Sequence, residues 1–289
     1  MEHIENGLLT VTVNPRGGEL TSLRGCDGVE YLWQADPAVW ARHAPLLFPI
    51  VGRLANDRYS FNGQSYEMKQ HGFVRDLDFT LSGHTDDRLI FTLQANETTL
   101  RQYPFEFILT RQYHLIEGML EVTTEIKNSG NEVMPFSIGE HPGFSLQWEK
   151  GDTVEDYSLE FEREETLDAI RLNDQHLLSS RMDRIMTRNR VLALSHTLFN
   201  EDALIFLKVK SDTLSLCSRR QRQRLVIEFP GYPYLGIWAK PGAPFVCIEP
   251  WYGYSDTVGH DGDLMRKPGI QKLGQGQTFA CVWRVRICP

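Results

Sequence analysis

The sequence lacks the features that mark membrane, secreted and nucleic-acid-binding proteins. No apolar run approaches the roughly 20 residues that span a bilayer. The first residues, MEHIENGLLT, have no basic stretch followed by an apolar one. Lysine and arginine total 30 against 38 acidic residues, and the net charge of -8 lacks the positive field that phosphate backbones attract. We therefore expect a soluble, cytoplasmic protein that binds neither membranes nor nucleic acid.

Cysteine is scarce and irregularly spaced. The 5 cysteines form neither a Cys-x-x-Cys pair nor a metal-binding spacing, so we predict that they are reduced residues of strands or of the core. The 9 histidines include no His-x-x-x-His pair, and residues 256–263 do not complete an EF-hand loop. The spacing therefore predicts no metal site, and any activity should survive chelation.

Alternation of apolar and polar residues is the dominant pattern. In the segment 120–127, LEVTTEIK, apolar residues mostly occupy even positions, as in a strand with one buried face. The same alternation returns at 9–13, 157–162, 225–229 and 279–287. The Asn62-Gly63 step, between two short strand-like segments, favours a type I′ hairpin turn.

Helical patterns are scarce, and turn signals cut the chain into short segments. Residues 37–43 could form a short helix, since Asp36 can cap it and Pro37 can occupy its first turn. No low-complexity linker or repeat divides the chain, and an all-β unit can exceed roughly 200 residues. We therefore predict an all-β fold: a large antiparallel β-sandwich with few short helices, forming one domain over residues 1–289.

Four segments gather polar residues with catalytic potential. Arg53 follows an apolar run and could donate forked hydrogen bonds to a hydroxyl-rich or anionic ligand, or pair with an acidic neighbour. His71 and His141 lie beside glycine or proline, where a ligand can approach the backbone, although either could be structural. Glu249 ends an apolar strand before Pro250. Such surroundings raise the pKa of a carboxyl toward the range of a general base; the alternative is a buried ion pair.

These segments together resemble the aldose 1-epimerase (galactose mutarotase-like) family. The stretch 52–63, GRLANDRYSFNG, is similar to the family's Asn-Arg-Ile-Ala-Asn-Gly-Arg-Phe…Asp-Gly signature. His71-Gly72, His141-Pro142 and Ile248-Glu249-Pro250 follow in the family's order. Two further segments, GEHPGF (139–144) and CIEPWYG (247–253), are similar to a LacX-like subgroup. The resemblance covers nearly the whole chain and implies a galactose mutarotase-like supersandwich.

The resemblance also implies roles for individual residues. Glu249 would be the general base and His141 the general acid of an isomerase that interconverts the α and β anomers of a hexose. His71 and Arg53 would hold and polarise the sugar. Asp202 is the best match for an aspartate that the family uses against sugar hydroxyls.

Anomer interconversion needs one base and one acid. The base removes the proton of the C1 hydroxyl, the acid protonates the ring oxygen, and the ring opens, rotates about C1–C2 and closes again. We expect the two groups on opposite sides of the ring, and a modest upward pKa shift that keeps His141 protonated, for which Glu140 is a candidate. No cofactor is needed.

Aromatic residues could complete the expected sugar site. Trp251, Trp238 and Tyr252 could pack on the apolar face of a pyranose or belong to the core. The expected partner is a small-molecule sugar; neither its identity nor the oligomeric state follows from the sequence.

Alternatives remain for the function. Residues 71–75, HGFVR, also resemble a segment of hexose-6-phosphate mutarotases, so Arg75 or Arg53 could meet a phosphate. The basic run at 218–224 could do the same or form a solvated turn. A noncatalytic sugar-binding protein of the same fold is another alternative. A glycosidase is less favoured because it needs two acidic groups flanking the bond.

Overall fold

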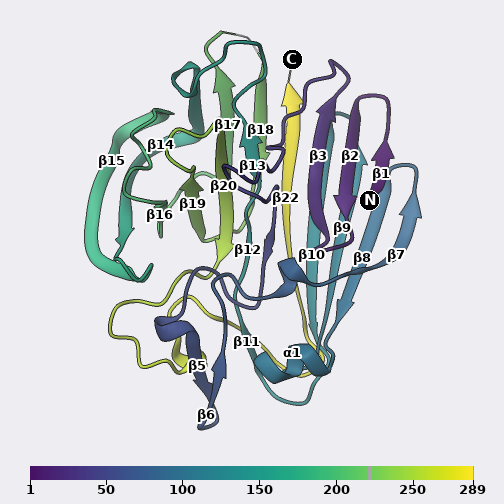
Figure 1. The fold of residues 1–289 in the computed structure, drawn as a ribbon, viewed down its shortest axis with the longest axis vertical. Coiled ribbons are helices and arrows are strands. Elements are labelled where there is room, and N and C mark those ends of the chain that lie inside the picture. The colour runs from purple at the N-terminus through teal and green to yellow at the C-terminus, as the bar shows by residue number, and fades with distance from the viewer. Residues whose placement is uncertain (221–222, 289) are drawn as a thin grey trace.

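The computed structural model describes residues 1–220 and 223–288, which fold almost entirely into antiparallel strands (Figure 1). The strands are β1 (Glu2–Glu5), β2 (Leu9–Asn14), β3 (Glu19–Gly25), β4 (Leu46–Leu47), β5 (Arg58–Phe61), β6 (Gln64–Glu67), β7 (Thr80–Thr85), β8 (Arg88–Gln94), β9 (Phe107–Ile116), β10 (Met119–Asn128), β11 (Met134–Phe136), β12 (Ile138–Glu140), β13 (Gly143–Ser145), β14 (Tyr157–Leu172), β15 (Leu178–Ala193), β16 (Leu204–Phe206), β17 (Thr213–Ser218), β18 (Arg224–Glu228), β19 (Tyr234–Trp238), β20 (Phe245–Tyr252), β21 (Gln271–Leu273) and β22 (Thr278–Cys288). The helices are α1 (Glu97–Gln102) and the 3₁₀ turns Ala55–Asp57, Val74–Asp76, Val154–Asp156 and Leu264–Arg266.

One large sheet organises the molecule. Within the described residues it joins 15 strands in the order β4-β12-β20-β19-β16-β14-β17-β18-β22-β10-β9-β8-β7, with β13 on β20 and β15 on β14. The sheet β1-β2-β3 packs over the part formed by β7 to β10 (Figure 1). Two further pairs of strands, β5-β6 and β11-β21, form separate two-stranded sheets. The predicted all-β antiparallel sandwich is confirmed.

The inner faces of the sheets form the core, as the period-two pattern predicts. Along β9 every second residue is buried, and β10 buries Leu120, Val122 and Ile126 in the same way. The predicted hairpin is present between β5 and β6, with φ of 49° at Asn62 and 77° at Gly63. Positive φ at both positions is what a type I′ turn requires.

One buried ion pair joins two distant strands of the large sheet, β9 and β12. Arg111, on the inner face of β9, donates hydrogen bonds of 2.8 and 2.7 Å to the carboxylate of Glu140. Its guanidinium also donates to Thr124 and to the hydroxyl of Tyr113, which in turn donates to the carbonyl of Gly18. Arg111 and Glu140 are both at most 1% exposed. Burying two charges costs several kcal/mol per ion, so the pair depends on this complete set of partners.

The expected helix at 37–43 is wrong. Only a turn forms there, although the side chain of Asp36 does accept a hydrogen bond of 2.9 Å from the amide of Ala38. The segment is held instead by tertiary contacts: Trp40 stacks on Phe245 with ring centroids 5.3 Å apart, and the amide of His43 donates to Glu19. These contacts override the local helical preference.

Other expectations concern cysteine, the basic run and the membrane. The five cysteines are free, and all lie in strands except Cys26, which is exposed in a turn. Gln221 and Arg222 of the basic run lie outside the described residues. Among the described residues, the structure contains no helix with the length and apolar character needed to traverse a bilayer.

Removing Arg111 should destabilise the fold strongly. The variant Arg111→Met leaves the Glu140 carboxyl buried without its partner, so we expect the free energy of unfolding to fall by about 3–5 kcal/mol. The double variant Arg111→Met/Glu140→Leu should recover part of that loss because no charge stays buried. Arg184→Met, which removes the partner of the exposed Asp168, should cost less than about 1 kcal/mol. Urea denaturation measures all three, and equal losses for both single variants would contradict the expectation.

Candidate active site

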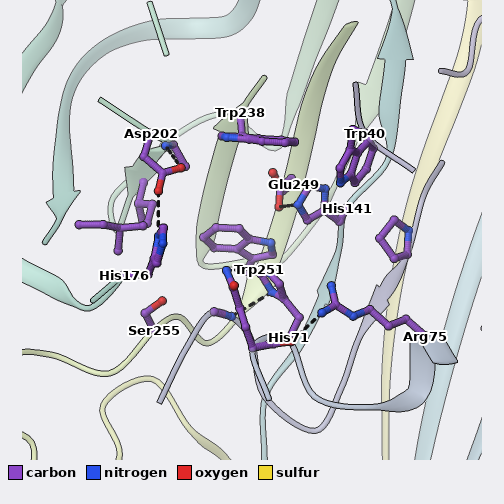
Figure 2. A pocket seen from close by; sticks show the side chains of 16 residues that line it. Trp40, His71, Arg75, His141, His176, Asp202, Trp238, Glu249, Trp251 and Ser255 are labelled. Atoms are coloured by element: carbon purple, nitrogen blue, oxygen red, sulfur yellow. Dashed lines mark hydrogen bonds and ion pairs between the residues drawn. The ribbon is translucent and has the colours of Figure 1, made fainter. Parts of the chain in front are cut away.

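Strand pairing places a carboxyl and an imidazole opposite each other. β12 and β13 both pair with β20, on either side of the break at His141-Pro142, and they keep one continuous register. The register pairs are Gly139 with Trp251 and Gly143 with Cys247. His141 therefore lies directly across from Glu249, and Nε2 of His141 is 3.2 Å from Oε2 of Glu249 (Figure 2). The Glu249 side chain is only 2% exposed.

A cavity of about 280 Å³ opens in front of this pair. Its size is near the lower end of the range for small-molecule sites, roughly 300–1,000 Å³. Three indoles, from Trp40, Trp238 and Trp251, supply apolar walls (Figure 2). The polar lining comes from Gln70, His71, Arg75, His141, His176, Asp202, Glu249 and Ser255. Aromatic walls with a few converging polar groups suit a small ligand that has both apolar faces and hydroxyl groups.

Glycines make room for the Trp251 indole. Gly139 on β12 and Gly236 on β19 flank Trp251 from its two neighbouring strands. A Cβ atom at either position would lie 2.5 Å from atoms of the Trp251 ring. Real Cβ atoms do not approach that closely, so the indole keeps its place only while both neighbours lack a side chain.

His71 reaches the cavity from a strained turn. Its φ is 65°, and a Cβ on the next residue, Gly72, would lie 2.1 Å from the carbonyl oxygen of Phe48. Glycine is therefore required after His71. Nδ1 of His71 accepts a hydrogen bond of 3.1 Å from the amide of Gly52, and its Nε2 lies 3.3 Å from the side-chain amide nitrogen of Gln70. Burial, with the charges of His141 and Arg75, holds the pKa of His71 well below 6.5.

Burial also favours the neutral forms of the facing pair. The pKa of Glu249 is raised well above 4.5, mainly by burial and further by the charge of Asp202. The pKa of His141 is lowered to about 3, mainly by burial, with Arg75 and Arg42 adding to the effect. Indoles cover the imidazole: the ring of Trp40 is stacked at 5.1 Å and that of Trp238 stands edge-on at 5.8 Å.

The two sides of the cavity carry opposite charges. Asp202 and Arg75 lie on opposite sides of the Glu249–His141 pair in Figure 2. The Asp202 carboxylate is 3.1 Å from Nδ1 of His176, which sits at the tip of the long β14–β15 hairpin. Burial and the neighbouring Arg42 lower the pKa of Arg75 to about 10, so its guanidinium remains charged at neutral pH.

Comparison with known proteins identifies the family of this chain. The family model for aldose 1-epimerase matches residues 3–269. The chain belongs to the aldose 1-epimerase family. It is 34% identical to the LacX proteins of Lactococcus lactis subsp. lactis over 93% of each chain.

Solved structures in the same family have nearly the same fold. A galactose mutarotase related enzyme from Lactobacillus acidophilus has a TM-score of 0.95 and 35% identity, over 100% of this chain and 97% of that one. A galactose mutarotase-like protein from Lactobacillus casei has a TM-score of 0.94 and 31% identity over 100% of both chains. The predicted family and its fold are thereby confirmed.

The cavity collects five of the six site residues predicted from the sequence: His71, His141, Asp202, Glu249 and Trp251. The exception is Arg53, whose guanidinium donates two hydrogen bonds of 2.7 Å to Asp57 and does not line the cavity. The structure thus shows the alternative that the sequence left open for Arg53, a pair with an acidic neighbour. Arg75, which the sequence offered only as a phosphate ligand, lines the cavity instead.

Two further expectations are also corrected. Glu140 does not face His141, because consecutive strand residues point to opposite faces and its carboxylate pairs with Arg111. The pKa of His141 is lowered, not raised, since no carboxylate offsets its burial sufficiently. Tyr252 points away from the cavity for the same alternation and packs against Phe279.

Several lining residues had no signal in the sequence. Trp40 comes from the segment expected to be helical, and His176 lies in a turn without a motif. Both reach the cavity through tertiary packing. The donor atoms of His141, Cys247 and Glu249 lie within 4.8 Å of one another, a grouping that spacing along the chain could not reveal. Burial raises the pKa of the Cys247 thiol well above its ordinary value, which disfavours the thiolate that would bind a metal.

Filling the space beside Trp251 should damage the site. Gly236→Ala forces the indole to move, so we expect the free energy of unfolding to fall by about 1–3 kcal/mol and the near-UV circular dichroism to change. Gly118→Ala is the control, because a Cβ there meets nothing within 4 Å and should change stability by less than about 0.5 kcal/mol. Wild-type stability and an unchanged near-UV spectrum in Gly236→Ala would show that the close approach is absent.

Proposed function

We propose that this protein is an aldose 1-epimerase that interconverts the α and β anomers of a hexose by acid–base catalysed ring opening and closure. The observation that supports this most is the 3.2 Å contact between Glu249 and His141, buried in a cavity walled by indoles. Membership of the aldose 1-epimerase family supports the same reaction.

The contact changes the expected arrangement of acid and base. A pyranose does not fit between two atoms 3.2 Å apart, so Glu249 and His141 must approach the sugar from one side. One side is sufficient, because the C1 hydroxyl and the ring oxygen are bonded to the same carbon. Glu249 would accept the hydroxyl proton while His141 donates a proton to the adjacent ring oxygen.

The pair can supply this chemistry although burial favours its neutral forms. A carboxylic acid beside a neutral imidazole holds as many protons as a carboxylate beside an imidazolium. One proton passing from Glu249 to His141 therefore produces the reactive pair without exchange with solvent. Ring opening restores the neutral forms of both groups, because Glu249 receives the hydroxyl proton and His141 gives its proton to the ring oxygen. Ring closure after rotation about C1–C2 runs the same steps in reverse.

The remaining lining would hold the sugar. The His71 ring and the neighbouring Gln70 amide would form hydrogen bonds with sugar oxygens, and the Asp202 carboxylate would accept from hydroxyl groups on the opposite side of the cavity. The indoles of Trp238 and Trp251 can cover the apolar C–H faces of a pyranose. These contacts position C1 and the ring oxygen against the pair, which reduces the entropy cost of the reaction.

Removing either member of the pair should abolish most of the activity. We expect Glu249→Gln and His141→Asn each to lower kcat for α-to-β conversion by about 10²–10⁴-fold, since each positioned proton transfer contributes a factor of this size. Two-dimensional NMR exchange on equilibrated galactose and glucose measures the rates, and polarimetry of freshly dissolved α-anomers gives an independent check.

Matched controls remove the same groups from the surface. Glu67→Gln and His84→Asn change exposed residues outside the cavity and should keep the wild-type rate. Circular dichroism verifies that each variant is folded. Rates no faster with wild-type protein than without it, across a broad panel of sugars, would favour a noncatalytic sugar-binding protein.

The shared proton predicts a broad pH profile. The lowered pKa of His141 places the acid limb of kcat/KM below 6.5, where the pair gains a second proton and Glu249 can no longer accept one. The raised pKa of Glu249 moves the alkaline limb of the profile to a pH well above 4.5, the ordinary pKa of a glutamate. On that limb the pair has lost its proton, and His141 has none to donate. We therefore expect a plateau across neutral pH, measured by NMR exchange from about pH 4 to about pH 10. A narrow maximum of kcat/KM between pH 4.5 and pH 6.5, the ordinary pKa values of the two groups, would indicate that Glu249 and His141 titrate independently.

A further inference from the structure

His176 lines the cavity, but the proposed reaction gives it no role. It lies at the tip of the hairpin that β14 and β15 form, and its Nδ1 is 3.1 Å from Oδ2 of Asp202 (Figure 2). Within the part of the chain that the structure describes, the imidazole forms no other hydrogen bond. Its side chain is 45% exposed, so a ligand in the cavity can reach the ring.

The contact with Asp202 assigns a hydrogen-bonding role to each nitrogen of the imidazole. A carboxylate oxygen only accepts hydrogen bonds, so Nδ1 of His176 donates to Asp202. In the neutral ring Nε2 then carries no proton and is an acceptor. Oδ1 of Asp202 accepts a hydrogen bond of 2.8 Å from the amide of Ala203, and each carboxylate oxygen keeps a lone pair for a ligand. His176 and Asp202 therefore present two neighbouring acceptors to the cavity.

Backbone hydrogen bonds fix the turn that carries His176. The amide of His176 donates to the carbonyl of Asn173 at 2.8 Å. Directly after the turn, the amide of Leu178 donates to the carbonyl of Asp256 at 2.8 Å, and the amide of Val258 donates to the carbonyl of Leu178 at 3.0 Å. The tip of the hairpin is thus attached to a neighbouring segment. A fixed acceptor loses little conformational entropy when a ligand binds.

Both residues of the contact have a backbone conformation that side chains disfavour. The φ angle is 58° at His176 and 69° at Asp202, in the left-handed region that favours glycine. Glycine at either position would relieve the strain but would remove the imidazole or the carboxylate. Strain of this kind is concentrated at functional sites. The backbone therefore points to a use for both side chains in the cavity.

The proposed chemistry indicates which hydroxyl groups meet these acceptors. His141 addresses the ring oxygen of the sugar, and Glu249 addresses the hydroxyl on C1. Asp202 and His176 lie on the Glu249 side of this pair, away from Arg75 (Figure 2). The carbons that follow C1 around the ring, on the side away from the ring oxygen, are C2 and C3. Their hydroxyl groups therefore lie toward Asp202 and His176.

We propose that His176 binds the sugar together with Asp202, the two residues accepting hydrogen bonds from the neighbouring hydroxyl groups on C2 and C3. The proposal rests on the epimerase function and specifies how its substrate is recognised. Nδ1 of His176 orients the Asp202 carboxylate, Nε2 accepts from one hydroxyl, and Asp202 accepts from the other. C2 and C3 keep their configuration when C1 inverts, so these contacts hold both anomers equally. His176 is thus a binding residue and takes no part in proton transfer.

Two substitutions separate the two nitrogen atoms of His176. His176→Gly removes both, and because glycine adopts a φ of 58° without strain, the turn should stay folded. His176→Asn keeps an N–H group in place of Nδ1 but has no atom in place of Nε2, and asparagine also tolerates this backbone conformation. The control is His196→Ala, which removes an exposed imidazole 3.2 Å from the Glu155 carboxylate, outside the cavity. Circular dichroism verifies that each variant is folded.

Three sugars locate the hydroxyl that Nε2 binds. NMR exchange measures kcat and KM for glucose or galactose, whichever reacts faster, and for its 2-deoxy and 3-deoxy forms. We expect His176→Gly to raise KM for the parent hexose about 10-fold and to change kcat less than about threefold, because both anomers lose the same contacts. His176→Asn should raise KM about 3–10-fold on the parent hexose, as for one lost hydrogen bond, and less than about twofold on one of the two deoxy sugars. His196→Ala should match wild type on all three.

The outcomes separate this proposal from the function on which it rests. A loss in His176→Asn that disappears on one deoxy sugar supports the contact and assigns it to that hydroxyl. An equal rise of KM on all three sugars, full recovery in His176→Asn, or a fall in kcat alone would overturn the proposal while leaving the epimerase function intact. If no sugar is interconverted, the function fails, and calorimetry then decides the contact. Weaker hexose binding in His176→Asn with no loss on one deoxy sugar supports it, and equal or absent binding refutes it.

Discussion

The ion pair between Arg111 and Glu140 is the interaction on which both the sandwich and the cavity depend. It holds the end of β12 against the inner face of β9, deep between the layers. Glu140 and His141 are consecutive, so the carboxylate that enters the core and the imidazole that enters the cavity share one stretch of backbone. The ion pair that holds Glu140 in place therefore also restricts the backbone position of His141. The sandwich thereby uses a costly buried charge pair to position the catalytic histidine of the proposed reaction.

Alternation along β20 separates packing from chemistry. Glu249 and Trp251 face the cavity, whereas Ile248 belongs to the main core and Tyr252 packs against Phe279. Because β20 is paired on both sides, the neighbouring strands must leave space on the cavity side, which explains the glycines Gly139 and Gly236 opposite its large residues. A strand paired on both sides is a suitable carrier for a base whose geometry has to be kept within a fraction of an ångström.

Local signals in the sequence predicted the strands, the hairpin at Asn62-Gly63 and the buried surroundings of Glu249, because each depends on residues close together in the chain. The contact of Glu249 with His141 depends on the pairing of β20 with β12 and β13, which local patterns do not encode. Arg53 shows the opposite failure: its motif suggests a ligand, but Asp57, four residues on, takes the guanidinium. The low pKa of His141 likewise depends on indoles brought from distant segments.

Desolvation shapes the acid–base chemistry proposed for this cavity. Indoles cover the His141 ring and the Glu249 side chain is almost fully buried, so water has little access to either group. In the proposed reaction this exclusion would let one proton serve both groups across a wide range of pH. A sugar that fills the cavity would extend the same exclusion to its own C1 hydroxyl and ring oxygen, so proton transfer to and from the pair would compete with few solvent molecules.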